Sequence, residues 1–252
     1  MTDGTAMAGQ RVLVVGGTAG IGRACAARMI AAGASVTVAG RNPDRGRAAA
    51  GELGAQLVTG DAADPVQAEA MVAEATALMG GLDVLLSGAG GDPMPRLLHT
   101  IPIAEVMGDV TGTLAPVILP ARAAYEVMRA QGHGCILMIA SDAGKLATPG
   151  ESAIGAAMAG IAMFGRVMAT EGKRQGIRVN TITPSIVRDT PLYDKLMADP
   201  FAAKLFGKAE QMAALGVAEP DDLAQLVAFL ASPAAARITG QTISLTGGIS
   251  AI

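Results

Sequence analysis

The chain has 252 residues, a length that fits one α/β domain with a large core, and its 51% hydrophobic and 16% charged residues are typical of a globular protein. A net charge of −3 and an aromatic content of 2% argue against a nucleic-acid partner or an anionic membrane surface. The first ten residues show no charged leader pattern, and no uninterrupted apolar run reaches membrane-spanning length. We therefore expect a soluble, cytoplasmic protein.

Short β-branched runs alternate with alanine-rich helical stretches along the whole sequence, a pattern typical of a parallel sheet covered on both faces. The expected strands are 11–15, 35–39, 56–59, 82–86, 135–139, 177–182 and 241–245. The expected helices are 21–32, 43–53, 64–79, 101–130, 152–174 and 220–230, with Pro116 and Pro120 predicted to kink or split the longest of them. Without repeats or linker-like composition, the pattern predicts a single doubly wound α/β domain over 1–252.

The cysteines and histidines predict neither a disulfide nor a metal site. Cys25 falls on an expected helix and Cys135 on an expected strand, so we expect two buried free thiols. His99 and His133 have no cysteine or carboxylate at ligand spacing, so we predict no metal.

A glycine-rich turn directly follows the first expected strand and opens a helix. Glycines permit a tight turn and close approach of a ligand to the backbone, and the free N–H groups of a helix N-terminus attract a pyrophosphate. The turn therefore predicts a dinucleotide site, although a turn without a ligand remains an alternative. The residues concerned are Gly16, Gly17, Thr18, Ala19, Gly20, Ile21 and Gly22.

The end of the second expected strand bears on the choice of nucleotide. A carboxylate there would bind the ribose 2′-hydroxyl of NAD, but this chain has Gly40 followed by Arg41. Because a guanidinium pairs bidentately with a phosphate, we expect NADP(H) in preference to NAD(H). A solvated arginine remains an alternative, and Asp44 and Arg45 nearby weaken the assignment.

With its spacing Gly-x-x-x-Gly-x-Gly, the turn resembles that of the short-chain dehydrogenases/reductases, a family with a Rossmann-like fold, and further segments extend the likeness over essentially the whole chain. These are Thr59-Gly-Asp61-Ala62, Ser87-Gly-Ala-Gly90, Ser141, Gly-Ala-Ala-x-Ala-Gly at 155–160, Asn180 and the C-terminal 239–248. The resemblance implies that Asp61 and Ala62 contact the adenine and that Ala89 and Gly90 lie against the nicotinamide ribose. It further implies a carboxamide contact from the segment holding Pro184, Ile186 and Thr190.

The chain departs from the family pattern at several of these segments. Val15 replaces a threonine before the turn, and both asparagines of the family's Asn-Asn-Ala-Gly segment are replaced in Ser87-Gly-Ala-Gly90. Ser185 stands in place of a glycine, with one extra residue before Thr190.

The catalytic residues that the family uses are mostly missing. The resemblance implies that Ser141 steadies the substrate oxygen, but Ile154 stands in the usual tyrosine position and Met158 in the usual lysine position. The family's asparagine corresponds to Thr113 by counting back from the serine or to Asp109 by the local pattern. Ile154 and Met158 lie four residues apart on one helix and so share a face, which we interpret as an apolar pocket wall, core packing being the alternative.

Another proton donor would have to replace the tyrosine. Candidates are Asp142, Lys145, Glu151, Ser152, Asp109 and His99, each of which is also compatible with a solvated side chain. Tyr125 and Tyr193 are the two tyrosines, and the sequence does not place either at the site.

A segment at about 187–216 lies where the family has a substrate lid, and its apolar stripe favours a hydrophobic substrate such as an alicyclic, steroid-like or acyl thioester compound. The stripe comprises Leu192, Tyr193, Leu196, Met197, Phe201, Leu205 and Phe206. A buried or subunit-facing helix pair is the alternative. The resemblance also implies a homotetramer or homodimer built through the long helices and the last strand.

Three functions are compatible with this sequence. The first is an atypical NADP(H)-dependent oxidoreductase that transfers hydride to or from a hydrophobic carbonyl or imine. The second is a catalytically degenerate cofactor-binding subunit that partners an active paralogue in a hetero-oligomer, and the third is a non-redox enzyme using the apolar pocket.

Overall fold

The computed structural model describes residues 6–91 and 93–250, in which seven parallel strands form one sheet in the order β3-β2-β1-β4-β5-β6-β7. The strands are β1 (Arg11–Val15), β2 (Ser35–Gly40), β3 (Gln56–Thr59), β4 (Val84–Ser87), β5 (Gly134–Ile139), β6 (Ile177–Pro184) and β7 (Thr242–Leu245). The strand order reverses direction between β1 and β4, the place where α/β sheets of this kind bind ligands.

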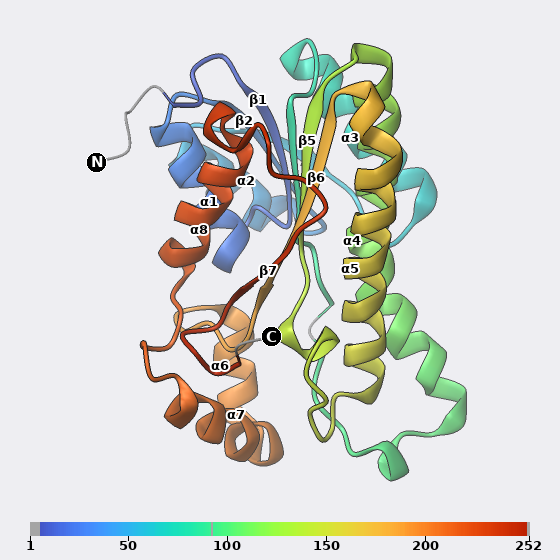
Figure 1. Ribbon diagram of the computed structural model, residues 1–252, viewed down its shortest axis with the longest axis vertical. Coiled ribbons are helices and arrows are strands. Elements are labelled where there is room, and N and C mark those ends of the chain that lie inside the picture. The colour runs from blue at the N-terminus through green and yellow to red at the C-terminus, as the bar shows by residue number, and fades with distance from the viewer. Residues whose placement is uncertain (1–5, 92, 251–252) are drawn as a thin grey trace.

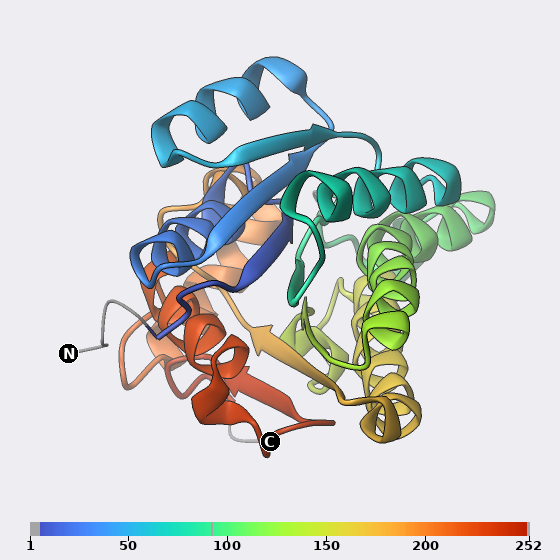
Figure 2. The ribbon, with the colours of Figure 1, turned by 90° about the horizontal axis from the view of Figure 1, so that it is seen from above.

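Helices cover both faces of the sheet (Figures 1 and 2), so the fold has three layers. On one face lie α1 (Gly20–Ala31), α2 (Pro43–Leu53) and α8 (Pro220–Ala231), and on the other lie α3 (Pro65–Met79), α4 (Ile103–Gln131) and α5 (Ser152–Gly172). Each face has its own apolar core, because side chains alternate along every strand. Two further helices, α6 (Pro191–Ala198) and α7 (Pro200–Met212), lie beyond the carboxyl ends of the strands.

The predicted strands and helices are all present, with small differences at their ends. The fourth strand begins at Val84, two residues later than predicted, and the sixth runs on to Pro184. The helix predicted to end at residue 174 ends at Gly172 and continues as a 3-10 turn over Lys173–Gln175. The doubly wound, single-domain fold is as predicted, and Cys25 and Cys135 are buried thiols. Residues 1–5, which include the start examined for a leader, lie outside the described residues.

Of the predicted kink or split at the prolines, the split is absent, because α4 runs as one helix through Pro116 and Pro120. Both prolines are buried, and their spacing of four residues places them on one side of the helix. At the same level the hydroxyl of Ser87, at the end of β4, donates a hydrogen bond of 2.8 Å to the carbonyl of Val117. Packing of this helix against the sheet and α5 outweighs the roughly 3 kcal/mol that each internal proline costs.

An ion-pair cluster joins the starts of three central strands. The Arg11 Nε and Nη2 atoms donate to the two carboxylate oxygens of Asp83 at 2.8 and 2.7 Å. The His133 ring Nε2 lies 3.0 Å from the same carboxylate. Arg11 begins β1, while Asp83 and His133 directly precede β4 and β5, so the cluster ties the amino-terminal edge of the sheet together.

Two helical segments, Ile103–Gln131 and Ser152–Gln175, are long and apolar enough to meet a length-and-composition criterion for a membrane span. Core helices of soluble proteins meet the same criterion, and both segments here cover the sheet. Their outer faces still expose large apolar side chains, among them Ile103 and Met107 on α4 and Met163 and Val167 on α5.

Candidate active site

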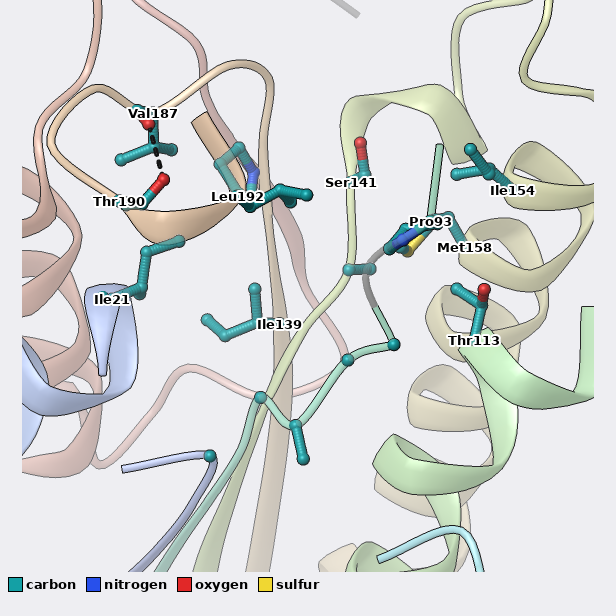
Figure 3. A pocket seen from close by; sticks show the side chains of 18 of the residues that line it. Ile21, Pro93, Thr113, Ile139, Ser141, Ile154, Met158, Val187, Thr190 and Leu192 are labelled. Atoms are coloured by element: carbon teal, nitrogen blue, oxygen red, sulfur yellow. Dashed lines mark hydrogen bonds between the residues drawn. The ribbon is translucent and has the colours of Figure 1, made fainter. Parts of the chain in front are cut away.

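A cavity of about 870 Å³ opens at the carboxyl ends of the strands (Figure 3). Its walls come from the turn between β1 and α1, the ends of β4, β5 and β6, one face of α5, and helices α6 and α7. In Figure 3, Ser141, Ile154, Met158 and Thr113 lie on one side of the cavity and Val187, Thr190 and Leu192 on the other. Segments far apart in the sequence therefore meet in one space.

The glycine turn is built for a close backbone approach. A Cβ at Gly16, whose φ is +88°, would lie 2.9 Å from the backbone nitrogen of Ala89, and one at Gly22 would lie 2.3 Å from the Gly16 carbonyl oxygen. No side chain caps the N-terminus of α1, which starts at Gly20 on the cavity. A cradle without side chains and an uncapped helix start fit the pyrophosphate of a dinucleotide. Six of the seven predicted turn residues line the cavity. The seventh, Gly17, packs closely against Val14 and Val38 on the neighbouring strands.

Two arginines line the cavity beside this turn. Arg41 follows β2, Arg45 lies in the first turn of α2, and both residues line the cavity. Asp44 points elsewhere, because its carboxylate pairs with Arg47. In the sequence Arg45 counted only as a complication, whereas the structure places it on the cavity together with Arg41.

Asp61 and Ala62 line the cavity after β3. The Asp61 carboxylate accepts a hydrogen bond of 2.9 Å from the backbone N–H of Ala63, so it also shapes the turn, and the helix cap of α3 is Asp64 instead. This placement of Asp61 is compatible both with a contact to a ligand and with a role in the turn.

The remaining predicted cofactor residues lie on neighbouring strand ends. Ala89 and Gly90 follow β4, and Pro184, Ile186 and Thr190 follow β6, all of them lining the cavity. The Thr190 hydroxyl caps α6 and donates to the Val187 carbonyl at 3.0 Å, as Figure 3 shows. The structure thus brings every predicted cofactor residue but Gly17 to one cavity.

Ser141 lies at the end of β5, where the chain turns into a short 3-10 helix over Asp142–Gly144. Its Oγ accepts a weak hydrogen bond of 3.2 Å from the N–H of Ala143, which leaves the hydroxyl proton available to a ligand. Glycines bring this segment against α5: a Cβ at Gly144 would lie 2.7 Å from the backbone of Ala159, and one at Gly155 2.9 Å from the Ala143 carbonyl oxygen. Ser141 is thereby held beside the face of α5 that carries Ile154 and Met158.

Ile154 and Met158 line the cavity, as their spacing predicted. Ile154 is buried, and Met158 also packs against the apolar core. Neither side chain can exchange a proton, so this wall of the cavity is chemically inert.

The structure decides between Thr113 and Asp109. Thr113 is buried and lines the cavity near Met158 (Figure 3), whereas Asp109 forms an ion pair of 2.6 Å with Arg96. Of the two positions, Thr113 is therefore the one that lines the cavity. The Thr113 hydroxyl donates to the Asp109 carbonyl at 3.0 Å within the helix.

The candidate proton donors divide into three groups. Asp142 and Glu151 line the cavity, His99 and Ser152 line a second pocket of about 550 Å³ next to it, and Lys145 contacts Ser244 and Asp142 outside the cavity lining. Tyr125 is remote, its hydroxyl bonding to Gln175.

Helices α6 and α7 cover the open side of the cavity. Most of the predicted apolar stripe lines it, namely Leu192, Tyr193, Leu196, Leu205 and Phe206. Met197 and Phe201 do not line it, and Phe201 lies against Gly150. Ile249, a cavity residue from the C-terminal tail, was not predicted, because no periodicity marks so short a segment.

Among residues 6–91 and 93–250, no three His, Cys, Asp or Glu side chains gather into a group that could hold a metal ion.

Comparison with known proteins identifies the family. The family model described as enoyl-(acyl carrier protein) reductase matches residues 16–250. The chain is 32% identical to cis-4-hydroxycyclohexanecarboxylate dehydrogenase of Sinomonas cyclohexanicum over 253 residues, which cover 99% of this chain and 100% of that protein.

Solved structures agree with this assignment. A short-chain type dehydrogenase/reductase from Mycobacterium marinum matches with a TM-score of 0.89 and 29% identity, over 98% of this chain and 97% of that one. A 7α-hydroxysteroid dehydrogenase in complex with NADH and 7-oxo glycochenodeoxycholic acid matches with a TM-score of 0.88 and 26% identity, over 98% and 97% of the two chains. The chain therefore belongs to the short-chain dehydrogenase/reductase family of oxidoreductases.

Proposed function

We propose that this protein is an NADP(H)-dependent oxidoreductase that acts on a hydrophobic carbonyl or imine with a proton donor other than tyrosine. The observation that carries the proposal is the continuity of the cavity. Its one end holds the glycine turn with Arg41 and Arg45, and its other end holds Ser141 and an apolar wall.

The cofactor preference rests on charge at the end of β2. Arg41 and Arg45 would pair with a 2′-phosphate, and no carboxylate stands at the end of this strand to bind a ribose 2′-hydroxyl in its place. The glycine turn would hold the pyrophosphate, and Ala89, Gly90, Pro184, Ile186 and Thr190 would surround the nicotinamide end. A bound nicotinamide cofactor would supply or accept the hydride.

The substrate half of the site favours a hydrophobic compound. Ser141 has a hydroxyl proton to donate to a substrate oxygen, while Ile154 and Met158 offer only contact surface. Segment 187–216, with α6 and α7, would act as a lid whose apolar side chains exclude water. The named substrates of two relatives, a cyclohexane derivative and a bile acid, are alicyclic compounds of this kind.

A second candidate function is that of a catalytically degenerate subunit that binds the cofactor and regulates an active paralogue. The inert side chains of Ile154 and Met158 favour it, because proton transfer commonly contributes about 10²–10⁴-fold to such reactions. The exposed apolar faces of α4 and α5 support assembly into a homodimer or homotetramer, or into a hetero-oligomer with that paralogue. Either candidate would work in the cytoplasm.

The test is to mix the protein with NADPH and a panel of hydrophobic ketones and imines and to follow the absorbance of the reduced nicotinamide. The variant Ile154→Tyr/Met158→Lys runs in parallel. Substrate-dependent oxidation by the natural protein supports the oxidoreductase and excludes the degenerate subunit. Turnover by the double variant alone would support the degenerate subunit. Failure to bind NADPH at all would overturn both and leave a non-redox use of the cavity.

A further inference from the structure

The ionisable groups of the cavity occupy three places. Arg41, Arg45 and Asp61 lie at the dinucleotide end, and Tyr193 lies on the helices that cover the opening, together with two exposed lysines. The two remaining ionisable groups among the described residues that line the cavity are the carboxyl groups of Asp142, next to Ser141, and Glu151, just before α5. A proton donor for the substrate has to come from one of these places.

Asp142 is engaged as an acceptor on both oxygens. The hydroxyl of Ser244 donates to its Oδ1 at 3.2 Å, and that of Ser250 donates to its Oδ2. The Lys145 ammonium lies 3.6 Å from Oδ1. Both oxygens of this buried carboxylate are therefore occupied as acceptors, and Asp142 serves to anchor the C-terminal tail.

Tyr193 is also committed to another contact. Its hydroxyl donates to the Glu210 carboxylate at 3.1 Å, and the same carboxylate accepts from Arg188. Burial and the hydrogen bond to Glu210 raise the pKa of Tyr193. The phenolic proton is therefore directed at α7 and not at the substrate.

Glu151, the other carboxyl group, directly precedes α5 and lies three residues before Ile154, about one helical turn from the inert wall. Its backbone is fixed on both sides: its N–H bonds to the Thr148 carbonyl at 3.1 Å, and the Gly150 carbonyl accepts from the Arg96 N–H at 2.8 Å. Gly150 has a φ of +88°, and a Cβ there would lie 2.7 Å from the Phe201 ring. The loop that presents Glu151 is thus tightly packed.

The contacts of the Glu151 carboxyl group do not outweigh the effect of its burial. Although Glu151 occupies the cap position of α5, its side chain accepts no capping hydrogen bond. Burial raises the pKa of this carboxyl, and a hydrogen bond with Thr148 opposes that effect only in part. His99 lines the second pocket together with Glu151, and Arg96, whose N–H bonds to the Gly150 carbonyl, has its guanidinium paired with Glu105 and Asp109.

Glu151 also connects two spaces. It lines the main cavity and, together with His99 and Ser152, the second pocket on the outer side of the loop. A carboxyl group in this position can face the substrate while exchanging protons with water from the second pocket.

Building on the oxidoreductase proposed above, we propose that Glu151 is the general acid of this site, the group that replaces the missing tyrosine. During reduction the carboxylic O–H bond of Glu151 breaks and an O–H bond to the substrate oxygen forms, as the carbonyl carbon receives the hydride of the reduced cofactor. The products are the alcohol, the oxidised cofactor and a carboxylate at Glu151, which regains its proton from water through the second pocket. In the oxidative direction the carboxylate acts as the base.

Glu151→Gln tests this assignment, with Glu171→Gln as the matched control, since Glu171 is an exposed residue near the other end of α5. We expect Glu151→Gln to keep its NADPH affinity and thermal midpoint and to lose about 10²–10⁴-fold in the rate of ketone reduction. The rate of the natural protein falls as pH rises through the Glu151 pKa, because only the protonated form donates, whereas the variant shows no such step. Glu151→Asp restores part of the rate and the pH step.

A second measurement does not depend on turnover. Carbon-13 NMR of glutamate carboxyl groups in the cofactor-free protein should show one group that titrates above the ordinary glutamate range, and this signal should be absent in Glu151→Gln. Unchanged turnover and pH profile in Glu151→Gln, or an ordinary titration of Glu151, would overturn its role as the acid. If the natural protein binds no NADPH, the proposed function fails, and the NMR titration still decides whether Glu151 holds a proton.

Discussion

Replacement of Arg41 and Arg45 should change the choice of nucleotide and leave the rest of the cavity intact. Both guanidinium groups line the cavity but lie exposed, so each hydrogen bond to a 2′-phosphate should contribute near the lower end of the range for charged groups, about 1.5 kcal/mol. Arg41→Ala alone should therefore weaken NADPH binding about tenfold. The double variant Arg41→Ala/Arg45→Ala should weaken it about 100-fold if the two contributions add.

Fluorescence titration with NADPH and NADH measures this difference directly. NADH affinity should stay unchanged in both variants, because NADH lacks the 2′-phosphate. Arg47→Ala is the matched control. Arg47 lies on α2, as Arg45 does, but it pairs with Asp44 and does not line the cavity. Equal losses for NADPH and NADH, or no loss for either, would refute the role assigned to the two arginines.

Three further predictions concern the turn, the opposite edge of the sheet and the thiols. Gly22→Ala should abolish dinucleotide binding and lower the thermal midpoint in calorimetry, because its Cβ would lie 2.3 Å from the Gly16 carbonyl oxygen. Asp83→Asn should cost about 2 kcal/mol of unfolding free energy at neutral pH, measured with urea. Burial alone would raise the pKa of Asp83, but its hydrogen bonds and ion pair lower the pKa by more, so the net pKa lies below its ordinary value. This stabilisation is therefore present above about pH 4 and is lost as the pH falls through the folded-state pKa. A cost of Asp83→Asn that persists in acid would contradict the ion pair. Burial raises the pKa of Cys25 to about 12 and that of Cys135 to about 11, so neither thiol should react with iodoacetamide at pH 8 until the protein unfolds, as mass spectrometry can show.

The sequence predicted the fold well because its signals were local and repeated. Period and composition located the strands, and the helices other than α6 and α7, to within a few residues, and the glycine turn located one end of the cavity. The exception was α4, where a rule that holds for an isolated helix was overridden by packing around Pro116 and Pro120.

The substrate end of the cavity was harder to predict, because its residues are joined only by tertiary contacts. The sequence offered six candidate donors of equal standing, and only the fold separates Glu151 from Asp142. The serine hydroxyls that engage Asp142 come from β7 and the C-terminal tail, more than 100 residues away. Likewise, the ion pair with Arg96 removes Asp109 from consideration, and no motif in the sequence records that pair.

The cluster of Arg11, Asp83 and His133 lies at the amino-terminal edge of the parallel strands, whereas the cavity lies at their carboxyl ends. The polar contacts that stabilise the sheet are thus separated in space from the side chains that line the cavity. Evolution can therefore exchange residues such as Ile154 and Met158 without loosening the central strands. This separation makes the fold tolerant of innovation: a lineage can lose one acid and recruit another on an unchanged frame.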